Sequence, residues 1–478
     1  MNSTSNVFRH RAHLWLALSA AVGVSLVLLY PDSFQQDGGY HFLYARWAWR
    51  EPEFFVGVWA RPLFTFVYAF PALLGFQAAR LLSVGVAVMT AWQTWRLAED
   101  AGLKRAELAV PLLFLQPSFF ILCPDLLTEP LFALVFVIAL RLHWRGRLRS
   151  GMLAASLLVM ARPEGFFVGL LWGIWILADR RSGATLWRRM PATLLLATGA
   201  FIWWAAAFAI SKDPLFIIHN WPREWAADGS YGQGDFWIYA LRAPEVVGIF
   251  TLAPFVYGLT HLLKRRALGT FTSSFLLLFG LHSLFRAFGL FNDAGYPRYL
   301  VCVAPAIALI TLVGWNLLAH RFAHYSPAAR LAWTTTLLGL SLIICALYMD
   351  GLIWARDARA VSDSYSWFRA HERPVSRLIW SEAYMCVVFN HNPLEKPPFT
   401  SNREQNLALL RESPHGTLIF WDEIIGPKWV KVDDRDLESL GYQRLHSESY
   451  HLTGWLFRNL PLRMVGPRQQ RMHLFYRE

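Results

Sequence analysis

The chain is poor in charge and in cysteine, and both shortages narrow what it can be. Only 16% of its 478 residues are charged, while 55% are hydrophobic and 23 are tryptophan. This composition argues against a soluble enzyme of the same length and favours a polytopic membrane protein. The four cysteines show no Cys-X-X-Cys spacing, so neither a disulfide framework nor a zinc site is supported.

The formal net charge is +12. Because the basic residues are scattered between apolar runs rather than gathered in one tract, they indicate membrane topology and not nucleic-acid binding. Crossing a bilayer takes roughly 20 residues. Two of the apolar runs, 130–142 and 151–162, reach that length only with their flanks. The eleven runs lie near 14–30, 78–97, 107–123, 130–142, 151–162, 165–178, 191–210, 244–262, 270–288, 300–318 and 331–349. The sequence therefore predicts an all-α membrane domain of about 11 transmembrane helices over residues 1–350.

Basic residues gather in alternate connections between these runs, and the positive-inside rule assigns such connections to the cytoplasm. The N-terminus is then cytoplasmic, and an odd number of spans places the C-terminal part outside. Residues 1–30 are read as a retained anchor of an inner-membrane protein, since no convincing signal-peptide cleavage site precedes Pro31. The basic set is Arg9, Arg11, Arg96, Lys104, Arg105, Arg141, Arg145, Arg147, Arg149, Arg180, Arg181, Arg188, Arg189, Lys264, Arg265, Arg266, Arg321 and Arg330.

From about Asp350 the composition becomes polar and short apolar runs alternate with helical stretches. Residues 377–380 and 417–421 are predicted as buried strands, with a helix over 403–411 between them. Residues 351–478 are therefore predicted to form a small extracytoplasmic α/β domain.

The first outer connection contains one acid, Asp37, followed by Gly38 and Gly39. A run of aromatic residues and arginines over 40–50 follows and is typical of a helix that lies in the membrane interface. An acid beside such a helix is placed where a lipid-linked substrate presents its polar head. The alternative is that Asp37 is one more solvated loop acid.

Two further outer connections hold acids close to the hydrocarbon. Asp125 and Glu129 lie in Cys123–Pro130, where Glu129 is also explained as a helix N-terminal acid that interacts with the helix dipole. Asp125 is harder to explain structurally, because a carboxylate at that depth normally has a partner or a function. Arg162 and Glu164 flank Pro163 in the next connection, where they either pair with each other or take part directly in catalysis.

The remaining candidates lie in two later outer connections. His219 is in the long loop 212–242, whose glycines do not form a phosphate-binding fingerprint. Arg298 and Tyr299 immediately precede the run at 300. Arg298 is explained as an ordinary interfacial anchor, whose side chain extends to the head groups. It is equally explained as a residue that binds a phosphate, because the planar guanidinium matches phosphate oxygens well.

One acid and nearby arginines are sufficient for transfer of a sugar from a polyprenyl phosphate. The leaving group is already a stable phosphate anion, so no general acid is strictly required. A carboxylate takes the proton of the acceptor hydroxyl, and cationic groups hold the departing phosphate.

The order of these motifs resembles the GT-C class of polytopic membrane glycosyltransferases, which includes mannosyltransferases and relatives of the protein O-mannosyltransferases and aminoarabinose transferases. The matching segments are Asp37, Asp125 with 128–132, 162–165 and 296–299, within residues 10–350. The resemblance implies an inverting hexosyltransferase that uses a polyprenyl-phosphate sugar, with mannose as the default hexose. It would act at the extracytoplasmic face on a lipid, glycan or protein acceptor.

In that class the acid of the first outer loop is the proposed catalytic base, which corresponds to Asp37. Asp125, Glu129, Arg162, His219, Arg298 and Tyr299 are assigned to substrate binding. Many members carry two adjacent acids in the first loop, whereas this chain has Asp37-Gly38. That departure weakens the case for a metal-assisted mechanism, and no cofactor is expected.

A transporter or flippase for lipid-linked sugars is the competing class. It explains the spans and interfacial aromatics equally well, but it predicts functional polar groups at mid-membrane inside discontinuous helices. The apolar runs are nearly free of acids at their centres, and the polar groups gather at one face. This distribution favours an active site on one side of the membrane.

Overall fold

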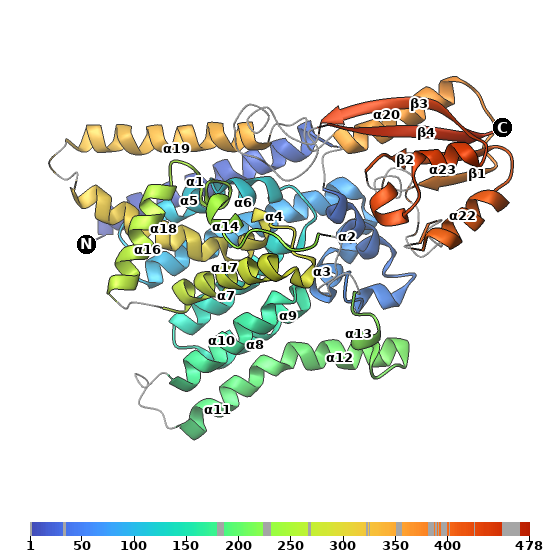
Figure 1. Ribbon diagram of the computed structural model, residues 1–478. Helices are drawn as coiled ribbons and strands as arrows, with labels where there is room; N and C mark the ends of the chain where they lie inside the picture. Colours follow the sequence, from blue (N-terminus) through green and yellow to red (C-terminus); the bar gives the residue numbers. More distant parts are fainter. Residues whose placement is uncertain are drawn as a thin grey trace. The chain divides into compact units, whose positions relative to one another are not determined.

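The chain folds into mostly helical structure with one small sheet (Figure 1). Two compact units are present: residues 1–28 with 48–345, and residues 29–47 with 346–478. The computed structural model describes residues 2–31, 35–178, 186–222, 231–265, 269–321, 324, 326–349, 356–380, 387, 390, 392, 399–400, 402–424, 426–451 and 469–478.

The first unit is a bundle of α-helices joined by short 3-10 turns. Its α-helices are α1 (Asn2–Leu29), α3 (Pro62–Leu73), α4 (Phe76–Asp100), α5 (Ala109–Phe114), α6 (Pro117–Leu122), α7 (Thr128–Trp144), α8 (Leu148–Ser156), α9 (Leu158–Ala161), α10 (Glu164–Ala178), α11 (Leu186–Leu194), α12 (Thr198–Ser211), α13 (Phe216–His219), α14 (Ile238–Leu241), α15 (Ala243–Val247), α16 (Leu252–Lys264), α17 (Thr270–Phe288), α18 (Ala304–Arg321) and α19 (Pro327–Met349). Its 3-10 turns are η1 (Pro52–Phe55), η2 (Ala106–Leu108), η3 (Leu195–Ala197), η5 (Leu290–Asn292) and η6 (Pro297–Val303).

Several of these helices are apolar enough to cross a membrane. By length and composition alone, five helical segments among the described residues qualify: 9–29, 189–211, 270–288, 297–321 and 327–348. Shorter apolar helices cover 62–73, 148–161 and 164–178. A multi-pass membrane protein is thus supported, and the count of about 11 spans stays a prediction.

The helices differ from the sequence-based expectation in two places. The run 107–123 is not one helix, because Gln116 is extended and Pro117 begins the separate helix α6. A residue before proline is driven out of the helical region, which explains the break. Helix α3 was not expected as an apolar segment, although most of its residues are hydrophobic.

Close backbone approach sets the packing of α16 on α18. A Cβ atom on Gly258 would lie 2.1 Å from the Ile310 carbonyl oxygen, and one on Gly314 would lie 1.8 Å from the Pro254 carbonyl oxygen. Only glycine fits at both positions. Small residues that let helix backbones touch are the usual basis of helix packing in membranes.

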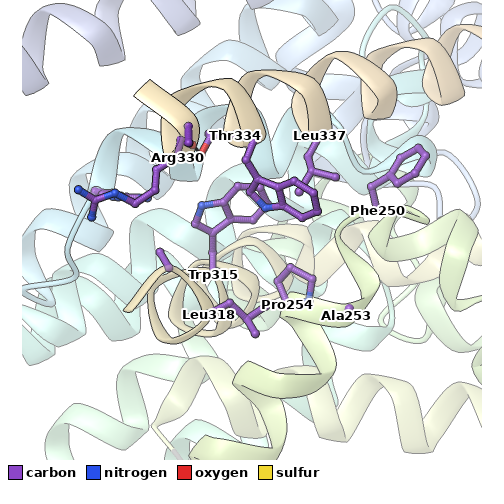
Figure 2. A pocket seen from close by; sticks show the side chains of 12 residues that line it. Phe250, Ala253, Pro254, Trp315, Leu318, Arg330, Thr334 and Leu337 are labelled. Carbon is purple, nitrogen blue, oxygen red and sulfur yellow. Dashed lines mark hydrogen bonds between the residues drawn. The ribbon is translucent and has the colours of Figure 1, made fainter. Parts of the chain in front are cut away.

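A cavity of about 430 Å³ lies beside this helix pair, lined by residues of α16, α18 and α19 together with Arg105 and Phe250 (Figure 2). Its walls are mostly apolar side chains, among them Trp315, Leu318 and Pro254.

The second unit contains α2 (Gln36–Trp47), α20 (Arg356–Ala370), α22 (Arg403–Glu412), α23 (Asp434–Ser439), a short π-helical turn (Gly426–Val430) and a four-stranded sheet. Its strands are β1 (Arg377–Trp380), β2 (Thr417–Asp422), β3 (Tyr442–His451) and β4 (Gln469–Arg477), in the order β1-β2-β4-β3. β1 and β2 are parallel, and β4 is antiparallel to both β2 and β3. The two predicted strands and the helix between them are confirmed within a residue.

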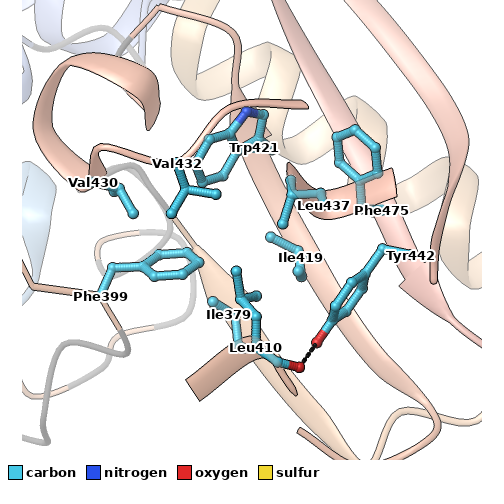
Figure 3. Close-up of a cluster of buried hydrophobic side chains, with 10 residues drawn as sticks. All are labelled: Ile379, Phe399, Leu410, Ile419, Trp421, Val430, Val432, Leu437, Tyr442 and Phe475. Atoms are coloured by element: carbon cyan, nitrogen blue, oxygen red, sulfur yellow. Dashed lines mark hydrogen bonds between the residues drawn. The ribbon is translucent and has the colours of Figure 1, made fainter. Parts of the chain in front are cut away.

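One face of this sheet carries a continuous apolar core with α22 and α23 (Figure 3). Ile419, Trp421 and Phe475 are fully buried there, and the Tyr442 hydroxyl donates a hydrogen bond to the Leu410 carbonyl at 2.9 Å. Every residue of β2 is buried, as expected for a central strand of a sheet that is covered on both faces.

Candidate active site

Three connections that are far apart in the sequence meet in a buried cluster of charges. Arg162 Nη1 lies 2.9 Å from Glu129 Oε1, and its Nη2 lies 2.7 Å from Glu164 Oε1. Arg162 Nη1 also donates to the Thr128 hydroxyl at 3.0 Å. Glu129 is only 1% exposed and Arg162 9%. Charges buried this deeply are retained only when they are paired, so each of these groups depends on the others.

The local backbone explains why the two acids point toward Arg162. Leu127 is extended and helix α7 starts at Thr128, which places Glu129 in its first turn. Arg162 is also extended, at φ −161°, because Pro163 follows it. Helix α10 then starts at Glu164, so both carboxylates lie at helix N-termini, where the helix dipole favours negative charge.

Arg298 and Tyr299 enter the cluster from η6. Arg298 Nε lies 3.7 Å from Glu129 Oε1, which is an ion pair longer than a hydrogen bond. The Arg298 guanidinium lies over the rings of Tyr296 and Tyr299, at 5.2 and 5.7 Å from their centroids. Arg162 lies 5.6 Å from the centroid of the same Tyr299 ring. Tyr299 is therefore a shared aromatic support for two arginines.

A second row of polar groups continues from Tyr299. The His282 ring stacks on Tyr299 with centroids 5.1 Å apart, and its Nδ1 lies 2.8 Å from Asp293 Oδ2. The Tyr239 hydroxyl donates to the other oxygen of Asp293 at 2.7 Å. His282 Nε2 lies 3.6 Å from Glu164 Oε1, so this second row also contacts the group of Glu129, Arg162 and Glu164.

Sequence reasoning missed His282, Asp293 and Tyr239, and it did not assign Glu164 to the site. A signal was present for His282. It lies four residues before Arg286 in an otherwise apolar run, on the same face of one helix. Ionisable residues inside membrane segments are functional candidates by default.

Asp125 is 2% exposed and lies in the turn between α6 and α7. One of its carboxylate oxygens accepts a hydrogen bond from the Leu126 backbone at 2.7 Å. The buried Arg80 donates to the Pro124 carbonyl at 2.9 Å and so holds the same turn. Asp125 therefore lies in the connection that also supplies Glu129.

His219 is not in this cluster. Its ring is 59% exposed and its Nδ1 lies 2.7 Å from Asp213 Oδ2. The Leu215 backbone N–H and then the His219 ring hold the pKa of Asp213 below its usual range. Part of the surrounding loop, residues 223–230, falls outside the described residues.

Asp37 lies in the first turn of α2, where the Gly39 N–H bonds the Gln35 carbonyl at 3.0 Å. The glycines after it were expected to form a turn, but they continue the helix. Asp37 belongs to the second unit, and its role as base stays a prediction.

In the part of the chain that the structure describes, no group of three His, Cys, Asp or Glu side chains is arranged to hold a metal ion. The cluster can bind and orient through charge instead. It has two arginines against two carboxylates at its centre, and Glu129 Oε2 accepts no hydrogen bond within the described residues. A buried carboxylate oxygen without a hydrogen-bond donor is rare, and a hydroxyl group of a ligand can donate to it.

Comparison with known proteins identifies the fold. No protein-family model and no curated protein matches the sequence. The crystal structure of ArnT from Cupriavidus metallidurans bound to undecaprenyl phosphate aligns with a TM-score of 0.56 at 13% identity, over 96% of this chain and 98% of ArnT. The apo structure of ArnT from the same organism aligns with a TM-score of 0.55 at 14% identity, over 97% of this chain and 98% of ArnT.

The structure of an oligosaccharyltransferase from Archaeoglobus fulgidus, tethered to an acceptor peptide, aligns with a TM-score of 0.45 at 13% identity. The alignment covers 93% of this chain and 73% of the oligosaccharyltransferase, and the similarity is too low to support an argument. The ArnT structures, in contrast, match over nearly the full length of both chains. The chain thus has a GT-C fold, and the resemblance predicted from its motifs is confirmed.

Proposed function

We propose that the protein is a membrane glycosyltransferase that moves a sugar from a polyprenyl-phosphate donor to an acceptor hydroxyl at the extracytoplasmic face. The observation that carries this proposal is the buried cluster of Glu129, Arg162 and Arg298 within a fold whose ArnT example holds undecaprenyl phosphate. The donor sugar is taken as a hexose, with mannose the first to test, and the acceptor as a lipid, a glycan or a protein.

The residues divide into distinct roles. All three guanidinium nitrogens of Arg162 contact Glu164, Glu129 or Thr128, so this arginine fixes the acids in place. Arg298 makes a longer contact to Glu129 than Arg162 does, and its guanidinium lies over two aromatic rings. This arrangement suits an arginine that leaves Glu129 and binds the phosphate of the donor. Glu129 Oε2 accepts a hydrogen bond from a hydroxyl of the sugar or the acceptor.

The reaction is a single displacement at the anomeric carbon. The acceptor oxygen forms the new bond to that carbon, and the bond from carbon to the phosphate oxygen breaks with its electron pair on the phosphate. Asp37 accepts the hydroxyl proton, and Arg298 stabilises the charge on the departing polyprenyl phosphate. Attack opposite to the leaving group inverts the anomeric configuration.

The test uses the full-length protein in lipid nanodiscs with a panel of radiolabelled undecaprenyl-phosphate hexoses and undecaprenyl-phosphate aminoarabinose. Cell-envelope extract supplies the acceptors, and heat-inactivated protein is the control. We expect label to pass from one donor into an acceptor fraction. If no donor is consumed, while sealed proteoliposomes move labelled donor between leaflets, the transporter interpretation replaces this one.

A further inference from the structure

The cavity beside α16 and α18 lies at the opposite end of the bundle from the charged cluster. Arg298 and Tyr299 come shortly before the first residue of α18, whereas the cavity is lined by Trp315, Leu318 and Ala319 in its last turns. A helix of 18 residues is about 27 Å long. The cavity therefore lies toward the other end of α18 and is separate from the candidate active site.

The walls combine an apolar slot with two cations. Arg330 lies at one end and Phe250 at the other, with Trp315 and Pro254 between them (Figure 2). Arg105 is the second arginine of the lining. A volume of about 430 Å³ is within the ~300–1,000 Å³ of typical small-ligand sites.

The arginines are held at the cavity with little neutralising charge. Arg330 Nε is buried and has no hydrogen-bond partner within the described residues. Neither Arg105 nor Arg330 forms an ion pair with a described side chain, although the charge of Arg105 acts on the nearby carboxylate of Glu107. Asn316 donates to the Lys104 carbonyl at 2.6 Å and so ties the connection that carries Arg105 to α18.

The slot exists because α19 packs closely along only part of its length. Leu338, Ser341 and Cys345 form a buried stripe toward its C-terminal end, where the Cys345 thiol bonds the Leu115 carbonyl at 3.4 Å. Toward its N-terminal end, Arg330, Thr334 and Leu337 face the cavity instead.

We propose that this cavity binds an anionic phospholipid of the leaflet opposite the charged cluster, with an acyl chain in the slot and the phosphate held by Arg105 and Arg330. Guanidinium groups suit phosphate oxygens, and tryptophans such as Trp315 and Trp333 suit head-group depth. The apolar walls explain why an acyl lipid, rather than a free phosphate ion, is the occupant.

The experiment is native mass spectrometry of the delipidated full-length protein, titrated separately with phosphatidylglycerol, phosphatidylcholine and inorganic phosphate. We expect phosphatidylglycerol to bind more tightly than phosphatidylcholine. Arg105→Gln combined with Arg330→Gln should weaken phosphatidylglycerol binding roughly 30-fold, since each basic residue near a membrane surface contributes about a factor of five. Inorganic phosphate alone should bind much more weakly.

Arg321→Gln is the matched control, because Arg321 ends α18 near the cavity but lies over the Tyr257 ring and outside the lining. It should keep parental lipid binding. Ala319→Phe fills the slot without changing the charge, and it should also weaken phosphatidylglycerol binding. This variant tests the site even if the double arginine variant does not fold. The proposal is overturned by equal affinity for the two phospholipids, by tight binding of phosphate alone, or by parental binding in Ala319→Phe.

Discussion

Arg162 and Glu129 form the central contact of the charged cluster, with 2.9 Å between Arg162 Nη1 and Glu129 Oε1. The two residues come from different connections, and Arg162 simultaneously holds Glu164 at 2.7 Å. One guanidinium therefore pairs with two buried acids, and Arg298 supplies the second positive charge at 3.7 Å from Glu129. A buried ion pair is costly to break, because the partner that remains is left charged and desolvated.

We therefore expect Arg162→Met to destabilise the protein by about 3–5 kcal/mol, the range for leaving a buried charge without its partner. The measurement is thermal unfolding of the detergent-solubilised protein, followed by loss of the monodisperse peak in size-exclusion chromatography. Arg96→Met is the matched control. Its ion pair with Glu99 is more exposed, at 26% and 29%, and its loss should cost no more than about 1 kcal/mol. Equal unfolding temperatures for the two variants would contradict the central role of Arg162.

Arg298→Lys tests the phosphate role. Lysine keeps the charge but loses the planar two-pronged geometry, so donor affinity should fall roughly tenfold. Binding of radiolabelled undecaprenyl-phosphate sugar to the protein in nanodiscs is the readout, with Arg96→Lys as the control for a general effect of the exchange. An interfacial anchor tolerates lysine well, and unchanged donor binding in Arg298→Lys would reject phosphate recognition.

The sequence predicts much of the cluster because its residues are polar side chains in the outer connections between apolar runs. Glu129, Arg162, Arg298 and Tyr299 are all predicted on that basis, and the structure brings them together. His219 was chosen from a loop and pairs locally with Asp213 instead. Spacing alone does not reveal which loop residue turns toward the bundle.

The inner row of the cluster could not be predicted in the same way. His282 meets Tyr299 and Asp293 only because α17 lies against η6 in three dimensions. The break of 107–123 was readable from Pro117, but hydropathy averaged over a window conceals such a kink. In the second unit, strands β1 and β2 were predictable because each is a short apolar run between polar segments.

The basic connections predict that residues 355–478 lie outside the cytoplasm. We expect a C-terminal alkaline phosphatase fusion, which is active only outside, to be active, and a C-terminal green fluorescent protein fusion to remain dark. Fusions after Arg265, in a basic connection, should give the reverse pattern and serve as the control. A fluorescent C-terminal fusion would mean that one span has been missed or added.

The sheet of the second unit should lose stability in mild acid because of His473. This ring is 2% exposed, and burial lowers its pKa even though Asp434 and Glu423 lie 3.6 and 3.8 Å from its Nε2. A histidine whose folded pKa is below its unfolded value of about 6.5 destabilises the fold as the pH falls through that value. The unfolded chain then binds the proton more readily.

Hydrogen exchange of β3 and β4 amides in the full-length protein checks this, at pH 7.5 and 5.5 with correction for intrinsic rates. We expect weaker protection at pH 5.5 in the parent and a smaller change in His473→Asn, which keeps a polar side chain opposite the Ser447 hydroxyl. The ion pair between Arg403 and Asp436 in the same unit does not contribute to the expected change in protection between pH 7.5 and 5.5. The Arg403 hydrogen bonds lower the pKa of Asp436, so this acid stays ionised in both conditions. Identical pH responses would exclude His473 as the cause.

Asp37→Asn tests the proposed base. The substitution preserves shape and removes the proton acceptor, so the protein should still insert and still bind donor. Loss of a positioned general base typically lowers the rate by ~10²–10⁴. An asparagine in the first turn of α2 leaves the helix start intact, so the variant removes the proton acceptor without disturbing the helix. Transfer of label in nanodiscs, at saturating donor, measures the loss.

Asp125→Asn and Glu129→Gln are the controls, because each is another acid near the bundle connections. Glu129→Gln should reduce donor or acceptor affinity more than the rate at saturation, since this residue is placed to bind and is already paired with Arg162. Asp125→Asn should leave turnover near parental, since its carboxylate accepts from the Leu126 backbone within its own turn. If Asp125→Asn abolishes transfer while Asp37→Asn does not, the base is Asp125. If both variants transfer label at the parental rate, neither Asp37 nor Asp125 is the base, and the proposed role of Asp37 is rejected.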